Sequence, residues 1–360
     1  MPKLKVGVLG ATGMVGQRFV TILADHPWYE VGTVAASPQS AGKTYSEAVA
    51  GRWSQGVEIP TAVSEMTVRN VNEIDAIASK VDFVCCALDM EKEDIRDLEN
   101  AYANAETPVI SNNSAHRWTP DVPMILPEIN PEHVEIVPAQ RKRLGTQLGF
   151  IAVKPNCSIQ PYVPAFHALQ EFGPAKASVC TYQAISGNGK TFATWPEMVD
   201  NVIPYIGGEE EKSETEPHKI WGGIVKDEIV PKRSPLISAQ CIRVPVTDGH
   251  MAAVSVSFDQ KPGPDEVISR WREFKSDPRG ADLPSSPKTF LTYYEEDDRP
   301  QTRLDRDFEN GMGITLGRLR EDNLFDYKFI ALSHNTVRGA AGGAVLMAEL
   351  LTKEGYIQAK

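Results

Sequence analysis

One cysteine lies in the segment that offers the clearest chemistry. The segment Lys154–Pro161 reads KPNCSIQP, and Cys157 stands between an apolar run at 149–153 and another at 163–169. The first run is typical of a buried strand that ends before Pro155, and the second has helical spacing. A thiol at a helix start meets unpaired N–H groups, which lower its pKa and favour the thiolate. We therefore predict a nucleophilic cysteine, and the alternative is a small buried apolar residue.

A nucleophilic thiol needs a nearby group that moves protons, and an imidazole has a suitable pKa near neutrality. Among the seven histidines, His250 is the best candidate because it follows Arg243 by seven residues, across the expected turn 246–249. A turn that short would direct both side chains to one pocket. There the planar guanidinium of Arg243 would bind a carboxylate bidentately. The alternative for His250 is a surface histidine at a strand edge.

A glycine-rich loop near the N-terminus predicts a dinucleotide site. Residues 4–9 are a short apolar strand, GATGMVG follows at 10–16, and residues 17–24 have helical periodicity. Glycines in this setting let the backbone approach a pyrophosphate, which the helix N-terminus then holds. A plain turn between strand and helix is the alternative. The residues expected to meet the cofactor are Gly10, Thr12, Gly13, Met14, Val15 and Gly16.

The segment after the second expected strand, 31–36, favours NADP over NAD. An NAD site usually carries Asp or Glu at this strand end, whereas here the chain continues with Ser37, Ser40 and Lys43. The hydroxyls can donate hydrogen bonds to a 2′-phosphate and the lysine can add charge, although a polar loop would look similar. The expected strand 81–88 should also end at the cofactor. We therefore add Cys86 to the cofactor contacts, although its sequence is that of strand core.

The length and the pattern of the chain predict two domains. At 360 residues it exceeds one typical domain. We expect a Rossmann-type α/β domain that binds NADP, made from residues 1–156 and 336–360. Residues 157–335 should form an α+β catalytic and dimerisation domain around a mixed, largely antiparallel sheet, because 177–183, 240–246 and 250–258 read as strands. The helix that opens near 334 should run to about 356 and return to the first domain.

Composition narrows the class of partner. A net charge of −11 argues against nucleic acid and anionic membranes, and no apolar run approaches the ~18 residues of a membrane span. The five cysteines contain no CxxC pair, so the sequence indicates neither a disulfide framework nor a metal site. The N-terminus enters a strand at once and leaves no room for a cleavable signal. We expect a cytoplasmic protein.

Six segments, taken together and in this order, resemble the aspartate-β-semialdehyde dehydrogenases of the archaeal and fungal branch. They are GATGMVG at 10–16, SNNSAHRW at 111–118, KPNCSIQP at 154–161, TYQAISGNG at 181–189, CIRVPVTDGH at 241–250 and HNTVRGAAGGAVLMAELL at 334–351. The resemblance implies a reversible, NADP-dependent reduction of L-4-aspartyl phosphate to L-aspartate 4-semialdehyde and phosphate, through a cysteine thioester. This reaction serves lysine, threonine, methionine and isoleucine biosynthesis. A homodimer or homotetramer is also implied.

The same resemblance assigns roles residue by residue. Cys157 corresponds to the nucleophile, His250 to the acid–base residue and Gln183 to the glutamine that orients the intermediate. The implied substrate contacts are Arg243 for the carboxylate, Glu209 for the amine, Arg117 and Lys212 for the phosphate, and Asn156. The acidic run 209–216 offers several registers for the amine contact. Further implied cofactor contacts are Ser186, Gly187 and Asn335.

Two other classes of protein remain open at this point. One is a related thioester-forming reductase, such as an N-acetylglutamyl-phosphate reductase or a malonyl-CoA reductase. The other is a non-catalytic NADP-binding redox sensor, which would keep residues 10–16 without turnover. Phosphate-dependent NADP reduction with aspartate semialdehyde would separate these possibilities.

Overall fold

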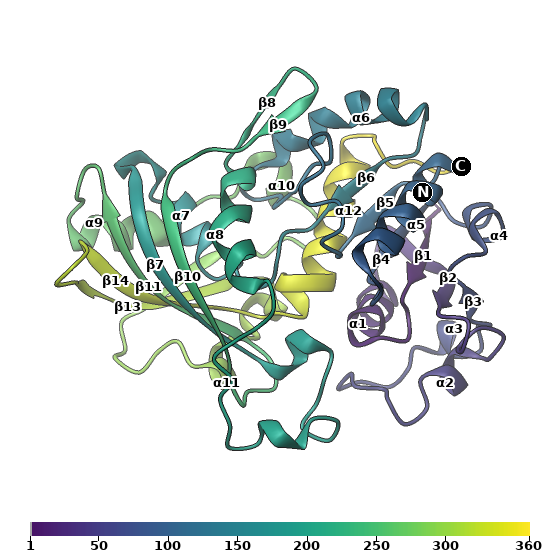
Figure 1. The fold of residues 1–360 in the computed structure, drawn as a ribbon, viewed down its shortest axis with the longest axis horizontal. Coiled ribbons are helices and arrows are strands. Elements are labelled where there is room, and N and C mark those ends of the chain that lie inside the picture. Colours follow the sequence, from purple (N-terminus) through teal and green to yellow (C-terminus); the bar gives the residue numbers. More distant parts are fainter. Residues whose placement is uncertain (1) are drawn as a thin grey trace.

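The first of two sheet-based domains is a parallel α/β unit (Figure 1). The computed structural model describes residues 2–360. In this unit the strands pair in the order β3-β2-β1-β4-β5-β6, and all of these pairs are parallel. Because the order reverses between β1 and β4, a ligand is expected outside the carboxyl ends of these two strands. The strands are β1 (Leu4–Leu9), β2 (Tyr29–Ala36), β3 (Arg69–Asn70), β4 (Phe83–Cys86), β5 (Val109–Ser111) and β6 (Ile151–Val153).

Helices cover this sheet, whose central strands are buried and apolar, as expected of a parallel sheet. The helix α1 (Met14–Leu23) buries Phe19 and Val20 in a core shared with Val6 and Val8 of β1. No helix within residues 2–360 combines the length and the apolar character that a membrane crossing requires. The other helices of this part are α2 (Tyr45–Ala48), α3 (Thr61–Ser64), α4 (Ile74–Ala78), α5 (Lys92–Asn104), η1 (Pro131–Ile136) and α6 (Val137–Leu144).

The second domain is built on a mixed sheet of order β10-β7-β11-β14-β13-β12. The strand β11 is antiparallel to β7 and β14, whereas β10 pairs with β7 and β12 with β13 in parallel. This confirms the predicted mixed sheet. The strands are β7 (Pro174–Gln183), β10 (Leu236–Arg243), β11 (His250–Phe258), β12 (Leu291–Tyr294), β13 (Ile314–Glu321) and β14 (Tyr327–Ser333), beside a small hairpin of β8 (Gly223–Val225) and β9 (Glu228–Val230).

The register of the second sheet gathers polar residues at one end. Arg243 is the last residue of β10 and pairs with Gln183, the last residue of β7. His250 is the first residue of the antiparallel β11 and pairs with Ser333 at the end of β14. Three predicted site residues therefore share one sheet end. The helices around this sheet are α7 (Val163–His167), η2 (Gln170–Phe172), η3 (Ile185–Asn188), η4 (Pro196–Met198), α8 (Glu209–Ile220), α9 (Pro264–Arg272), α10 (Pro278–Ala281), α11 (Thr302–Asp305) and η5 (Phe308–Gly311).

The C-terminal helix joins the two units. After β14, a π-helical turn η6 (Val337–Ala341) leads to α12 (Gly342–Lys353), which packs in the core of the first sheet. The predicted helix is thus interrupted, with Ala340 at φ −143° and ψ −108°. Arg338 in this turn makes a fully buried two-fold ion pair with Glu128 and donates to Gln160 Oε1 at 3.2 Å. The turn is therefore anchored beside the Cys157 loop. The residue boundaries of the two domains stay a prediction.

Candidate active site

A cavity of about 440 Å³ lies where the strand ends of the two sheets meet. It brings together the predicted nucleophile, all five predicted substrate contacts and part of the predicted cofactor site. Because residues of both domains line the cavity, one ligand bound in it can contact residues that lie far apart in the chain. The predicted residues that line it are Val15, Arg117, Asn156, Cys157, Gln183, Ser186, Gly187, Glu209, Lys212, Arg243 and Asn335.

Cys157 occupies a bend after β6, and the helix α7 begins only at Val163. The thiol therefore does not lie at a helix start. Cys157 is half-buried in the cavity wall, and the loss of water around its thiol, followed by the charge of Glu209, raises its pKa to about 11, while Lys154, Arg117 and Arg243 oppose the rise. The predicted lowering of this pKa is thus wrong for the free protein. A ligand that neutralises the charge of Glu209 would leave the three nearby cations free to stabilise the thiolate.

This raised pKa gives an expected pH dependence. A pKa above the usual thiol value leaves less thiolate at neutral pH, so Cys157 of the free protein should react slowly with iodoacetamide. The rate should rise about tenfold per pH unit between about pH 7 and 10, without levelling off. Mass spectrometry of the peptide that carries Cys157 measures the rate, and a free small thiol treated in parallel serves as the control. A plateau reached near neutrality would contradict the expectation.

His250 lies directly behind Gly187 rather than on the cavity wall. A Cβ atom on Gly187 would stand 3.1 Å from His250 Nε2 and 2.9 Å from Arg243 Nη1. His250 is fully buried, and its Nδ1 accepts the backbone N–H of Ala184 at 3.1 Å. The neutral ring therefore carries its proton on Nε2, which has no hydrogen-bond partner within residues 2–360. Burial, followed by the charge of Arg243, lowers the pKa of His250 well below 6.5.

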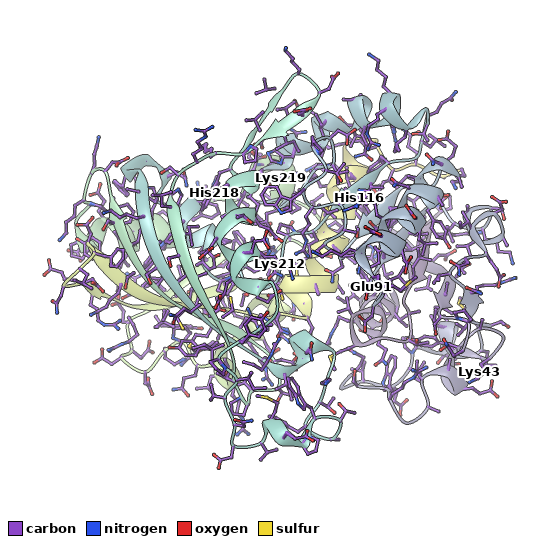
Figure 2. All side chains as sticks on the ribbon, viewed as in Figure 1. Lys43, Glu91, His116, Lys212, His218 and Lys219 are labelled. Atoms are coloured by element: carbon purple, nitrogen blue, oxygen red, sulfur yellow. The ribbon has the colours of Figure 1, made fainter. Side chains whose placement is uncertain are left out.

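The acidic run of α8 presents one carboxylate to the cavity. Glu209 Oε1 accepts Lys212 Nζ at 2.7 Å and Asn156 Nδ2 at 3.0 Å, and Gln183 Nε2 lies 3.4 Å from Glu209 Oε2. Figure 2 shows Lys212 at the centre of the molecule, on the part of α8 that faces the first domain. Glu210 and Glu214 instead accept backbone N–H groups of β10. The structure thus favours Glu209 among the registers that the sequence left open.

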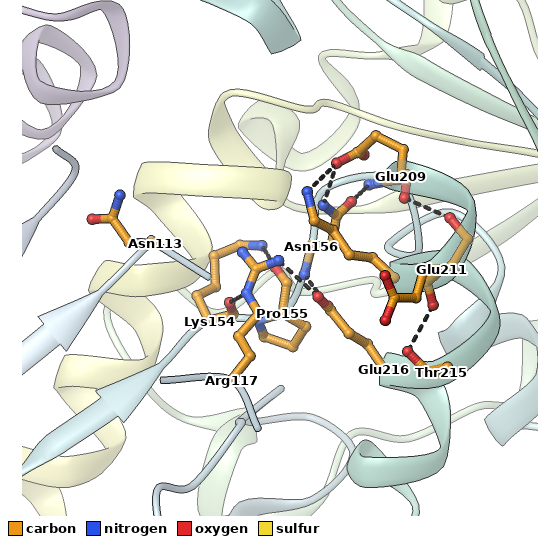
Figure 3. A network of polar contacts seen from close by, with 12 residues as sticks. Asn113, Arg117, Lys154, Pro155, Asn156, Glu209, Glu211, Thr215 and Glu216 are labelled. Atoms are coloured by element: carbon orange, nitrogen blue, oxygen red, sulfur yellow. Dashed lines mark hydrogen bonds and ion pairs between the residues drawn. The ribbon is translucent and has the colours of Figure 1, made fainter. Parts of the chain in front are cut away.

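Arg117 reaches the same cavity from the loop after β5. It is 6% exposed, and its guanidinium donates to Glu216 Oε1 at 2.8 Å and to two backbone carbonyls, those of Lys154 and Asn112. Figure 3 shows Arg117 beside Lys154 and Asn156, with Glu216 reaching toward it from α8. Arg117 and Lys212 both line the cavity, so two cations from different domains are available to one anion.

The glycine loop has the shape that a pyrophosphate needs. Gly10 has φ +84°, and a Cβ there would lie 2.1 Å from the carbonyl oxygen of Ala87. A Cβ on Gly16 would lie 2.0 Å from Gly10 O, so the loop and the start of α1 pack more closely than side chains allow. Among the described residues no side chain caps α1, which leaves its first N–H groups for a ligand. Val15 connects this loop to the cavity that holds Cys157.

Comparison with known proteins identifies the family. Residues 5–137 match the semialdehyde dehydrogenase NAD binding domain, and residues 166–338 match the semialdehyde dehydrogenase dimerisation domain. The aspartate-semialdehyde dehydrogenase of Aspergillus fumigatus is 42% identical, with 99% of each chain covered. The chain belongs to the aspartate-semialdehyde dehydrogenase family. The relative from Archaeoglobus fulgidus is also 42% identical, over 99% of this chain and 100% of its own.

Solved structures of the aspartate-semialdehyde dehydrogenase family share the fold. The crystal structure of the Candida albicans enzyme with NADP matches with a TM-score of 0.88 at 37% identity, covering 99% of this chain and 100% of that one. Aspartate semialdehyde dehydrogenase II of Vibrio cholerae matches with a TM-score of 0.76 at 25% identity, over 99% of this chain and 100% of that one. The predicted family and the predicted α/β architecture are both confirmed.

In this member of the aspartate-semialdehyde dehydrogenase family, the predicted 2′-phosphate contacts Ser37, Ser40 and Lys43 differ in their exposure and in their surroundings. Ser37 is exposed after β2, whereas Ser40 is 4% exposed and its Oγ accepts Arg52 Nη2 at 3.2 Å. Lys43 lies at the periphery of the first domain (Figure 2). Arg52 is a cation that sequence reasoning missed, because it lies outside the strand–loop–helix pattern that selected the serines. It adds positive charge beside Ser40.

Three other predicted cofactor contacts, Cys86, Ser186 and Asn335, are buried. Cys86 ends β4 fully buried, with its Sγ 3.4 Å from Asn113 Oδ1, so the thiol is part of the core. Asn335 Nδ2 donates to Ser186 Oγ at 2.8 Å, which fixes two cavity residues of different elements against each other. The roles of these residues in cofactor binding stay predictions.

Proposed function

We propose that this chain is an NADP-dependent aspartate-semialdehyde dehydrogenase, which reversibly interconverts L-4-aspartyl phosphate and L-aspartate 4-semialdehyde with phosphate. The observation that carries the proposal is one cavity lined by Cys157, by Val15 of the glycine loop and by the charged set of Arg243, Glu209 and Arg117. NADP is the cofactor named with the Candida albicans relative. The shape of the loop at Gly10 and Gly16 fits a dinucleotide.

The charges of the cavity match this substrate group by group. Arg243 offers a planar guanidinium for the α-carboxylate, and Glu209 a carboxylate for the amine. Arg117 and Lys212 supply two cations for the phosphate. An N-acetylated substrate would place a neutral amide against Glu209, which makes N-acetylglutamyl phosphate a poorer match.

The proposed reaction proceeds through a covalent intermediate on Cys157. Cys157 attacks the acyl carbon of aspartyl phosphate, the C–O bond to phosphate breaks, the thiol proton passes to the departing phosphate, and a thioester remains. NADPH, when bound, supplies the hydride that takes the thioester to the aldehyde level. We infer that the Nε2–H of His250, which lies behind Gly187, comes into contact with the substrate when Gly187 moves aside and then stabilises the oxygen that becomes negative as the carbon turns tetrahedral. The C–S bond of the resulting hemithioacetal then breaks, which releases the aldehyde and restores the Cys157 thiolate.

The deciding experiment is an assay in the oxidative direction. Purified protein with aspartate semialdehyde, NADP and inorganic phosphate should give NADPH absorbance that depends on all three. Substituting N-acetylglutamate semialdehyde, or malonate semialdehyde with coenzyme A, should give little signal. A redox sensor would bind NADP without turnover, and that result would overturn the proposal.

Arg243→Lys is expected to raise KM for aspartate semialdehyde about tenfold or more, with a smaller change in kcat. A lysine keeps the charge but loses the fork that grips both carboxylate oxygens, and it cannot also hold the Ala184 carbonyl, 2.6 Å from Arg243 Nη1. Steady-state kinetics with varied semialdehyde tests this. An unchanged KM would contradict a carboxylate role for Arg243.

We also propose that the chain forms a homodimer, or a tetramer of such dimers, through the second sheet. The family match over residues 166–338 is to a dimerisation domain. Alternate side chains of β7 and β10 are exposed on one face, with Tyr182 at 36% and Leu236 at 68%. Sedimentation equilibrium, with Leu236→Asp as the variant expected to shift the mass toward the monomer, tests this assignment.

The cysteines support a cytoplasmic site of action. All five are free thiols within residues 2–360, as suits a reducing compartment. A free Cys157 is required by the proposed thioester. Fractionation of cells that produce the protein would test the location.

A further inference from the structure

One face of α8 carries charged residues at helical spacing. Glu209, Lys212, Glu216 and Lys219 follow each other by three or four positions, so they share a face. Glu216 and Lys219 contact the first domain or the segment around Cys157, and Glu209 contacts Asn156 there as well as Gln183 and Lys212. Lys219, 1% exposed, donates to the carbonyls of Arg117 and Thr119 at 2.7 and 2.9 Å. The helix therefore holds both the loop of the proposed phosphate cation and the loop of the nucleophile.

Glu216 connects these two loops with a single carboxylate. It is 1% exposed, its Oε1 accepts Arg117 Nη1 at 2.8 Å, and its Oε2 accepts the backbone N–H of Asn156 at 2.7 Å. Figure 3 shows Glu216 reaching from α8 toward both partners, with a dashed line to each. Asn156 directly precedes Cys157, and its Oδ1 accepts the N–H of Ser158 at 2.6 Å. The position of Cys157 is thus fixed on both sides by Asn156, which itself rests on Glu216.

We propose that Glu216 is a positioning residue that sets Arg117 for phosphate and Cys157 for attack at the same time. This inference rests on the proposed function. Arg117 is nearly buried, and a buried guanidinium needs a counterion. Because the counterion is shared with the Asn156 N–H, the position of the phosphate cation is linked to that of the sulfur. The reaction needs this link, since the phosphate must lie within reach of the acyl carbon that the sulfur attacks.

The test compares variants on the same helix. Glu216→Gln keeps the size but turns an N–H₂ group toward one of two donors, and Glu216→Asp keeps the charge but is too short to reach both. The matched control is Glu214→Gln, because Glu214 accepts the Ala239 N–H at 2.9 Å and faces β10 instead of the cavity. Phosphate KM and kcat are measured in the oxidative assay, and the Kd of NADP is measured by fluorescence.

Both Glu216 variants should raise the phosphate KM by about tenfold or more and lower kcat by a similar factor. The control should stay within about twofold of the wild type in both parameters, and the NADP Kd should not change in any variant. In an Arg117→Gln background, Glu216→Gln should no longer change the phosphate KM but should still lower kcat through Asn156. This division separates a positioning role from a general loss of stability.

Three outcomes would overturn the inference. The first is a phosphate KM and kcat of both Glu216 variants that match those of Glu214→Gln. The second is a phosphate-KM effect that is fully additive with Arg117→Gln. The third is failure of both Glu216 variants to fold, which would make the residue a structural one. A wild-type protein without phosphate-dependent turnover would instead overturn the proposed function.

Discussion

Cys157→Ala is expected to abolish turnover, with a fall in kcat of about 10⁴-fold or more. Without the sulfur there is no thioester, and no other nucleophile among the described lining residues holds the same place between Arg243, Arg117 and the glycine loop. The affinity for NADP should stay within about twofold of the wild type, because the loop around Gly10 and Gly16 does not depend on the thiol. Single-turnover assays and NADPH fluorescence titration measure the two quantities separately.

The control for this variant is Cys180→Ala, which removes a partly exposed thiol from β7, outside the cavity. It should retain full activity. A loss of NADP binding together with activity in Cys157→Ala would contradict the division of labour between the two parts of the cavity. When wild-type protein is quenched during turnover, mass spectrometry should detect the added mass of the acyl group on the Cys157 peptide only.

The parts of the fold that sequence could predict are those with local signals. The apolar strand before Gly10 and the periodic segment after Gly16 predict strand, loop and helix without distant residues. The seven-residue interval between Arg243 and His250 correctly places both at one sheet end, because one strand ends and the next begins there. Local patterning suffices where the geometry is set by a turn.

The parts that sequence could not predict depend on distant contacts. The sequence pattern predicts a helix start at Cys157, but the chain makes a bend there, and its surroundings are fixed by Glu216 and Gly339, which are remote in sequence. The charge balance at the thiol likewise depends on residues of both domains. The only local signal for Glu216 is its spacing of seven from Glu209, which places both on one face of α8 once the helix is known.

His250 poses a more specific question about mechanism, because its hydrogen bonds define which nitrogen can act. Nδ1 is occupied as an acceptor from Ala184, so the neutral ring offers only Nε2–H. A buried N–H without a partner costs free energy, which favours a role in which a ligand oxygen supplies the missing acceptor. This geometry suits donation to a developing oxyanion better than removal of a proton from Cys157, since the latter needs a free lone pair on Nε2.

His250→Asn should therefore lower kcat by about 10²- to 10³-fold while KM for phosphate and the Kd of NADP stay near the wild-type values. Asparagine can still accept the Ala184 N–H, so the fold is spared while the donor is withdrawn from its position.

Because burial and Arg243 hold the pKa of His250 well below 6.5, the ring is neutral at neutral pH. Wild-type kcat should then show no imidazole titration between about pH 6.5 and 8 and should fall only in more acidic solution, where protonation of Nδ1 breaks the bond to Ala184. An activity that rises through pH 7 with the titration of one group, and loses that rise in His250→Asn, would establish a general base instead. A kcat of His250→Asn within about threefold of wild type would leave the imidazole as part of the core, and the oxyanion would then have to be stabilised by other donors of the cavity.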